Sequence, residues 1–258
     1  MERRFHCTAC GKCCAGLLPL TLTDALAHAE RFPLAMLWTT VRQGAKSFEI
    51  TSRLGTTIQL GKRKQAAVQI APISYLPPSL SCPALASDGL CSIHADKPSR
   101  CRTMPFYPYR EEWDQADLLI PRTGWECDTS DAAPVVYRDK EIVKREDFDV
   151  ERRGLIDQAA TLRAYADGLL AKAPNVAATL TDMAKKPAGG HMVLNFTALV
   201  SRLAHIDMAT FARQQAPVLS AFAGKTAGDS EMVEFHEYYR DNAAGMARFL
   251  KRNNTKPL

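Results

Sequence analysis

Phe5-His6-Cys7-Thr8-Ala9-Cys10-Gly11-Lys12-Cys13-Cys14 is the stretch that decides how the first half of this chain folds, because it places four cysteines within eight residues. A spacing of two residues lets successive thiolates converge on one metal, since the intervening turn brings both side chains to the same side. Gly11 suits the tight turn of such a metal knuckle, where a positive backbone angle helps amides reach the sulfur. Buried free cysteines that act as small hydrophobes do not gather at this density. The stretch therefore predicts a thiolate metal site.

Four further cysteines follow, all in the first half of the chain. Between Ser81 and Tyr109 three of them share a stretch with four prolines, each of which removes a backbone donor. Hydrogen-bonded ladders alone do not order such a stretch, whereas a metal would. The candidate metal ligands are Cys7, Cys10, Cys13, Cys14, Cys82, Cys91, Cys101 and Cys127.

The identity of the metal stays open between zinc and an iron–sulfur cluster. Adjacent Cys13 and Cys14 are awkward ligands for one tetrahedral ion, so one of them points elsewhere or the site holds a cluster or two ions. Eight thiolates suffice for two zinc sites of four cysteines each. Four of them suffice for one [4Fe–4S] cluster, which leaves four for a second site or for redox work. The triple Cys7-x2-Cys10-x2-Cys13 repeats the spacing of ferredoxin-type loops.

Nearby charged residues and histidines are weaker candidates. Lys12, Arg100 and Arg102 lie beside cysteines, where they either offset thiolate charge or stand as solvated charges on loops. His94 follows Cys91 at a spacing that a mixed Cys/His site would tolerate. A lone histidine is more often a surface or hydrogen-bonded residue, and we prefer that interpretation here.

Composition and charge narrow the class of protein. The chain has 258 residues, enough for one good core or two smaller ones. Its net charge of +5 is spread evenly along the chain, which argues against nucleic acid as a partner because that would favour a concentrated basic face. No apolar run is long enough for a membrane span, and the start lacks the apolar segment of a secretory signal. We therefore expect a cytoplasmic protein with reduced thiols.

The sequence predicts an α+β fold in two regions. Residues 1–146 would form a cysteine-rich metal-binding domain with a small antiparallel sheet and short helices, and residues 147–258 a helical region. Polar–apolar alternation predicts strands at 47–51, 57–60, 67–70, 117–120 and 135–137. Helices are predicted from Thr23 to Arg31 and from Pro33 to about Gly44, and then near 155–169, from Pro174, at 195–222 and at 230–252.

Two blocks of residues resemble a known family, the CxxCxxCC cysteine-cluster proteins, described as a zinc- or iron-chelating domain. The first block is the opening stretch quoted above, and the second runs through Cys82-Pro83-Ala84-Leu85, Gly89-Leu90-Cys91-Ser92-Ile93-His94 and Lys97-Pro98-Ser99-Arg100-Cys101-Arg102-Thr103-Met104-Pro105-Phe106. His94 and Lys97 depart from the common aromatic and arginine without removing a thiolate. The resemblance covers about residues 1–130, and it implies that all eight cysteines belong to the site.

Three functions follow from this sequence. The first is a metal-binding protein, such as a carrier, sensor or assembly factor, whose helical region offers a surface to a protein partner that the sequence does not identify. The second is an iron–sulfur enzyme similar to the flagellin lysine-N-methylases, which share such a cluster and use S-adenosylmethionine. No motif for that cofactor is evident, and the cysteine spacing differs from the CxxxCxxC loop of radical enzymes. The third is a structural zinc module that serves as an interaction domain.

Overall fold

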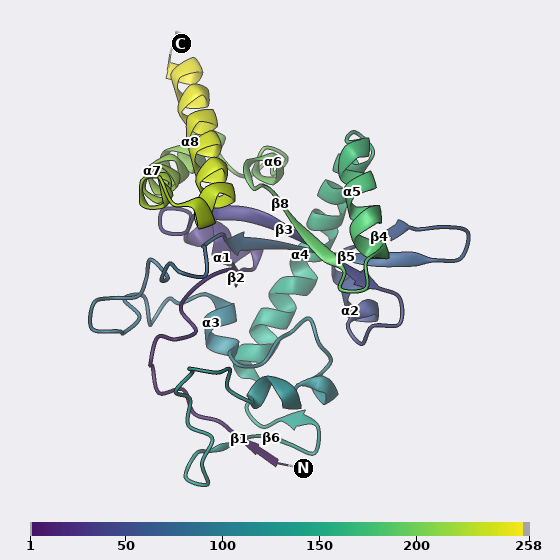
Figure 1. The fold of residues 1–258 in the computed structure, drawn as a ribbon, viewed down its shortest axis with the longest axis vertical. Coiled ribbons are helices and arrows are strands. Elements are labelled where there is room, and N and C mark those ends of the chain that lie inside the picture. The colour runs from purple at the N-terminus through teal and green to yellow at the C-terminus, as the bar shows by residue number, and fades with distance from the viewer. Residues whose placement is uncertain (1, 255–258) are drawn as a thin grey trace.

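The computed structural model describes residues 2–254. Within them, two antiparallel sheets lie in different parts of the molecule (Figure 1). The smaller sheet has the order β1-β6-β7, from Glu2–Arg4, Val135–Arg138 and Glu141–Ile142. The larger has the order β2-β5-β3-β8, with β4 also paired to β5. Its strands are β2 (Leu18–Pro19), β3 (Leu34–Arg42), β4 (Thr56–Gln59), β5 (Gln65–Ser74) and β8 (Gly190–Asn195). The expected α+β class is confirmed.

Strand β5 organises the larger sheet. It pairs with β3 along one edge, from Leu34 opposite Ser74 to Arg42 opposite Ala66. Its other edge takes β2 near one end and β4 near the other. Strand β8 then pairs with the free edge of β3, so a strand from beyond residue 147 completes a sheet that begins in the first half of the chain.

The prediction of a helix from Pro33 to Gly44 is wrong, because these residues form β3. Seven of its nine residues are β-branched, aromatic or buried aliphatic positions, and the segment Trp38-Thr39-Thr40-Val41 has side chains that fit a pleated surface well. Strand partners on both edges bury the segment, and such tertiary pairing overrides a weak local preference for helix.

Two predicted strands are also corrected. Residues 47–51 begin helix α2 (Phe48–Leu54), and residues 117–120 fall largely in the 3₁₀ turn η2 (Ala116–Leu119), which follows η1 (Glu112–Asp114). Polar–apolar alternation over five residues fits either element, and packing decides: Ile50 and Leu54 of α2 lie four residues apart and contact Leu155 and Ala159. The strands predicted at 57–60, 67–70 and 135–137 are confirmed as β4, β5 and β6.

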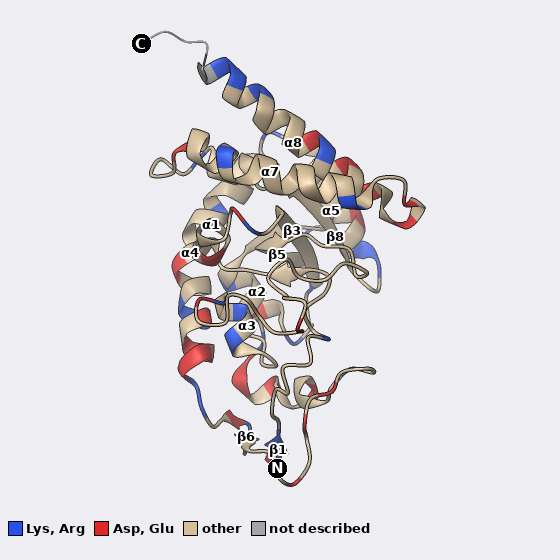
Figure 2. Ribbon diagram, turned by 90° about the vertical axis from the view of Figure 1, so that its left-hand side faces the viewer, with Lys and Arg blue, Asp and Glu red and all other residues tan. Residues whose placement is uncertain are grey.

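The long helix α4 (Glu146–Leu170) runs from the small sheet to the large sheet (Figure 1). At about 1.5 Å per residue its 25 residues span roughly 37 Å. Phe148 near its start packs in the core of the small sheet, and Leu162 and Tyr165 near its end pack in the core of the large one. Figure 2 shows basic and acidic residues interspersed along this helix.

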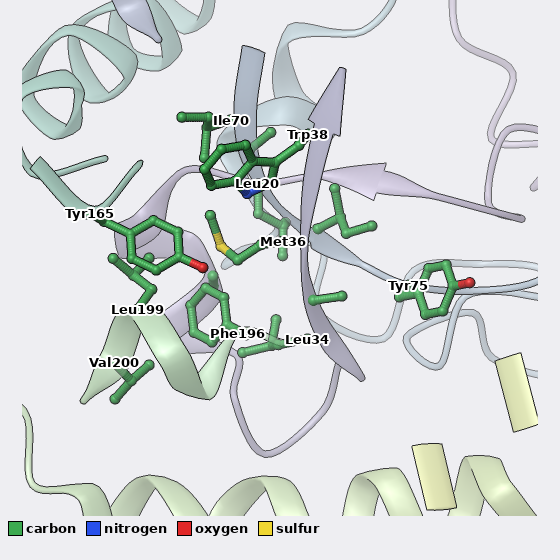
Figure 3. Packing of buried hydrophobic residues seen from close by; sticks show 14 of the residues in the cluster. Leu20, Leu34, Met36, Trp38, Ile70, Tyr75, Tyr165, Phe196, Leu199 and Val200 are labelled. Carbon is green, nitrogen blue, oxygen red and sulfur yellow. The ribbon is translucent and has the colours of Figure 1, made fainter. Parts of the chain in front are cut away.

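The main core lies against the large sheet. In Figure 3 Met36 and Trp38 of β3 face Tyr165 of α4 and Phe196, with Leu199 and Val200 of α6 (Thr197–Val200) beside them. The rings of Trp38 and Tyr165 meet edge to face at 5.9 Å between centroids. Burial of this cluster ties β3 to the second half of the chain.

The remaining helices lie around the large sheet and the long helix α4 (Figure 1). They are α1 (Leu22–Ala27), α3 (Ser99–Thr103), α5 (Pro174–Lys185), α7 (Met208–Thr226), η3 (Ser230–Met232) and α8 (Val233–Asn254). Helices α7 and α8 lie side by side in Figure 1. Gln215 of α7 fastens them to the sheet, because its side chain accepts from the amide of Leu34 and donates to the carbonyl of Phe32.

The helical C-terminal region is confirmed, with the addition of β8. The predicted helix at 195–222 is divided, since β8 ends at Asn195 and α7 begins only at Met208. Helix α1 is shorter than predicted and is capped by Thr21. The boundary between residues 146 and 147 stays a prediction. Within residues 2–254 no helix combines the length and apolarity needed to cross a membrane.

Candidate metal centre

The eight cysteines lie on three segments at one side of the molecule. In Figure 1 these are the trace between β1 and β2, the stretch from β5 to α3 and the loop between η2 and β6. All eight thiols are free; Cys7 and Cys13 are exposed and the other six are half-buried. Backbone hydrogen bonds join the three segments and set which cysteines meet.

The N-terminal segment pairs with the loop that carries Cys127. His6 and Asp128 form an antiparallel bridge and exchange both backbone hydrogen bonds, at 2.8 and 3.0 Å. The residue after His6 and the residue before Asp128 therefore face one another, and these are Cys7 and Cys127. The hydroxyl of Thr8 adds a hydrogen bond to the carbonyl of Glu126 at 2.9 Å. Two thiols separated by 120 residues in sequence are thus held as neighbours.

The same segment pairs, a few residues later, with the start of the second cysteine block. Ala15 and Ser81 form an antiparallel bridge, and the amide of Cys82 donates to the carbonyl of Cys14 at 2.8 Å. The pairing places Cys14 opposite Cys82 as His6 and Asp128 place Cys7 opposite Cys127. The adjacent cysteines Cys13 and Cys14 therefore stand between two separate backbone pairings.

A short turn brings Cys91 back beside Cys82. Leu85 bridges Cys91, and the amide of Ser92 donates to the carbonyl of Ala84 at 2.8 Å. The sulfur of Cys82 accepts from the amide of Ala84 at 3.4 Å. A backbone amide aimed at sulfur stabilises the thiolate over the thiol, and metal-bound cysteines commonly accept such bonds.

Helix α3 presents Cys101 from a firmly held base. Arg100 is buried and pairs with Glu151 of α4 at 3.4 Å, with side-chain exposures of only 4% and 6%. Arg100 also donates to the carbonyl of Phe106. At the start of α3 the amide of Ser99 donates to the carboxylate of Asp24 in α1 at 3.1 Å. The position of Cys101 is therefore set by two helices rather than by its own loop.

The opening stretch contains a tight turn at Gly11, with the positive backbone angle that the sequence predicts there. Gly11 adopts a φ of 71° and Ala9 a φ of 57°, and the amide of Cys14 donates to the carbonyl of Gly11 at 2.9 Å. The amides of Lys12 and Glu126 donate to the sulfur of Cys10, and these bonds lower the pKa of the thiol below its ordinary value.

The neighbouring thiols perturb one another. A hydrogen bond from Cys14 lowers the pKa of the Cys13 thiol to about 6, and the same bond, followed by burial, raises the pKa of Cys14. Burial raises the pKa of Cys101 to about 12, with additional contributions from the charges of Cys82 and Cys91. Thiols that resist ionisation in this way need a cation before they become thiolates, and a thiophilic metal supplies one.

The residues present fit a thiophilic metal by their chemistry. The donor set is eight free thiols, seven on loops with few strand hydrogen bonds and Cys101 on α3, with backbone amides that donate to the sulfurs of Cys10 and Cys82. In the part of the chain that the structure describes, no three His, Cys, Asp or Glu side chains stand close enough to enclose an ion.

The structure also places the charged residues and the histidine near the cysteines, which were the weaker candidates. Lys12 pairs loosely with Glu126 at 3.9 Å and Arg102 with Asp147 at 3.8 Å, both at the surface. Arg100 is not a solvated loop charge, because Glu151 holds it in the interior, and its positive charge opposes the rise that burial causes in the pKa of Cys101. His94 is exposed, in agreement with its interpretation as a surface residue. Sequence reasoning did not find the structural roles of Thr8 and Glu151, which no spacing rule reports.

Comparison with known proteins gives a match to a family model. No curated protein and no solved structure matches this chain. The matched segment begins at His6 and ends at Asp128, the two residues of the bridge that closes the cysteine region. Residues 6–128 match the model of the CxxCxxCC family, which is described as a "putative zinc- or iron-chelating domain".

Proposed function

We propose that this protein binds zinc ions or an iron–sulfur cluster through its eight cysteines. The observation that carries the proposal is the placement of all eight free thiols on three segments, of which the N-terminal one hydrogen-bonds to both of the others. The family description, zinc- or iron-chelating, supports metal binding of this kind. The metal would supply charge to hold the thiolates and a covalent link between the segments.

The packing of the cysteines against two different cores favours a structural role for the metal. Cys127 contacts the core of the small sheet, whereas Cys82 and Cys91 contact the core of the large one. The segments between these cores hold few ladder hydrogen bonds, so metal bound there would stabilise their connection. We infer that metal loading and the order of the cysteine loops are coupled.

Other aspects of function stay predictions. Eight reduced thiols accord with a reducing compartment such as the cytoplasm. A protein partner for the helical region and an S-adenosylmethionine-dependent activity are each open to test, the second by calorimetric titration of that cofactor into the metal-loaded protein.

The deciding experiment is the metal and acid-labile sulfide content of anaerobically purified protein, with an absorption spectrum of the same sample. Matched iron and sulfide with a broad visible absorption identify a cluster. Colourless protein that retains stoichiometric zinc identifies zinc sites. Protein that carries neither, and that takes up neither zinc nor iron with sulfide after reduction of its thiols, contradicts the proposal.

A further inference from the structure

The backbone pairings divide the eight cysteines at the junction between Cys13 and Cys14. Before the junction, the bridge of His6 with Asp128 sets Cys7 against Cys127. After it, the bridge of Ala15 with Ser81 sets Cys14 against Cys82. The two ends of the segment from His6 to Ala15 therefore pair with different loops. One end lies beside the loop of Cys127, and the other lies beside the loop of Cys82.

Hydrogen bonds at the thiols extend the two pairs. The amide of Glu126, the residue before Cys127, donates to the sulfur of Cys10, so Cys10 lies with the first pair. The bridge of Leu85 with Cys91 returns Cys91 to the loop of Cys82, so Cys91 lies with the second pair. Cys13 and Cys14 hydrogen-bond to one another, so the two groups adjoin at the junction between them.

Packing separates the groups as well. Cys127 contacts the hydrophobic cluster of the small sheet, which contains Phe5 and Tyr137. Cys82 and Cys91 contact the main core, and Cys101 stands on α3, which the buried pair of Arg100 and Glu151 fixes to α4. One group thus rests on the periphery of the fold and the other on its interior.

We infer that the eight cysteines form two four-cysteine metal centres, an outer one of Cys7, Cys10, Cys13 and Cys127 and an inner one of Cys14, Cys82, Cys91 and Cys101, and that the outer centre exchanges its metal first. The inference rests on the proposed metal binding and adds the assignment of ligands. Four thiolates complete either a tetrahedral zinc ion or a [4Fe–4S] cluster, so the division holds for both.

The order of exchange follows from access. Cys7 and Cys13 of the outer centre are exposed, whereas all four cysteines of the inner centre are half-buried. The shell around a metal site controls how solvent and competing ligands reach it. A chelator therefore reaches the outer centre, through its exposed Cys7 and Cys13, more readily than the inner one, where no thiol is exposed.

The test is metal content per chain in variants of each group. C7S/C127S is expected to retain half of the wild-type metal, C91S/C101S the other half, and the quadruple variant none. Transfer of the metal to a chromophoric chelator is expected to show two phases of equal amplitude in the wild type. C7S/C127S then loses the fast phase and keeps the slow one. H94A, at an exposed position in the same block, serves as the matched control with full metal and both phases.

The outcomes separate this inference from the proposed function. Three results would overturn the division while leaving metal binding intact: C7S/C127S loses all of its metal, C7S/C127S retains all of it, or the wild type shows a single phase. Each of them indicates one joined centre or another ligand set. Wild-type protein that binds no metal overturns the proposed function itself. Because C7S/C127S alters only the peripheral group, it remains decisive even where C91S/C101S fails to fold.

Discussion

At the scale of single residues, Gly11 is the position where backbone geometry limits the site most. Its φ of 71° lies in the left-handed region, and an added Cβ would approach Leu85 Cδ1 at 3.3 Å. Alanine in this conformation costs about 1–2 kcal/mol, and the cost falls on the ordered turn that the metal needs. G11A should therefore lower zinc affinity by about 5- to 30-fold in a competitive chelator titration.

The matched control for Gly11 is Gly61, where an added Cβ meets nothing within 4 Å and the backbone is not left-handed. G61A should leave zinc affinity unchanged. Equal affinities of G11A and the wild type would show that the turn is not part of the metal-bound state.

Thr8 is the second informative residue, because its hydroxyl ties the opening stretch to the loop of Cys127 through the carbonyl of Glu126. T8V keeps the shape and removes the donor, at a net cost of about 0.5–1.5 kcal/mol. We expect the fast phase of metal transfer to accelerate about two- to tenfold while the slow phase stays constant. T8S, which keeps the hydroxyl, should behave as the wild type. Acceleration of both phases to the same extent would contradict the outer placement of this bond.

At the scale of elements, α3 depends on the buried pair of Arg100 and Glu151. Removal of one partner leaves a buried charge without compensation, and such losses cost about 3–5 kcal/mol. R100L and E151L should each lower the free energy of urea unfolding by that amount. R100L/E151L should recover most of the loss, because well-packed apolar pairs often replace buried ion pairs without penalty.

Arg102 provides the control for this cycle, since it lies on the same helix and pairs with Asp147 at the surface. R102A should change the free energy of unfolding by less than about 0.5 kcal/mol. A double variant as unstable as the sum of its singles would show that the two charges do not interact.

Some strands of the fold could be predicted from the sequence, and others could not. Strands β4, β5 and β6 were predictable because their local pattern agrees with their environment. Strand β3 was not, because a short apolar run fits helix or strand until its partners are known. Strand β8 begins at the second of two adjacent glycines, and only its register with β3 makes it a strand. The second half of the sheet was therefore invisible to local patterns.

At the scale of the whole molecule, the spacing of the cysteines predicts the ligand set but not its arrangement. Four thiols within eight residues predict a metal site from the sequence alone. The pairing of Cys7 with Cys127 and of Cys14 with Cys82 depends on bridges between distant segments, which no spacing contains. The buried base beneath Cys101 depends in turn on α4, which lies beyond the matched family segment.

This arrangement predicts which parts of the fold need the metal. From the sequence, a structural zinc domain would unfold over residues 1–130 when the metal is removed. The structure narrows this expectation, because β3 and β5 share with α4 and α6 a core of buried apolar side chains, which Cys82 and Cys91 contact only from its edge as partly buried residues. Chelation followed by hydrogen exchange should lower protection about tenfold or more in residues 6–16, 81–98 and 122–131.

The strands β3 and β5 and the helices α7 and α8 should keep their protection after chelation, because their hydrogen bonds and apolar contacts remain intact. Added zinc, or iron with sulfide, should restore the loops and so exclude damage by the chelator. Unchanged protection in all three loops would separate metal binding from loop order. Loss of protection in β3 and β5 would instead mean that the thiol centres stabilise the main core, through the contacts that Cys82 and Cys91 make with it.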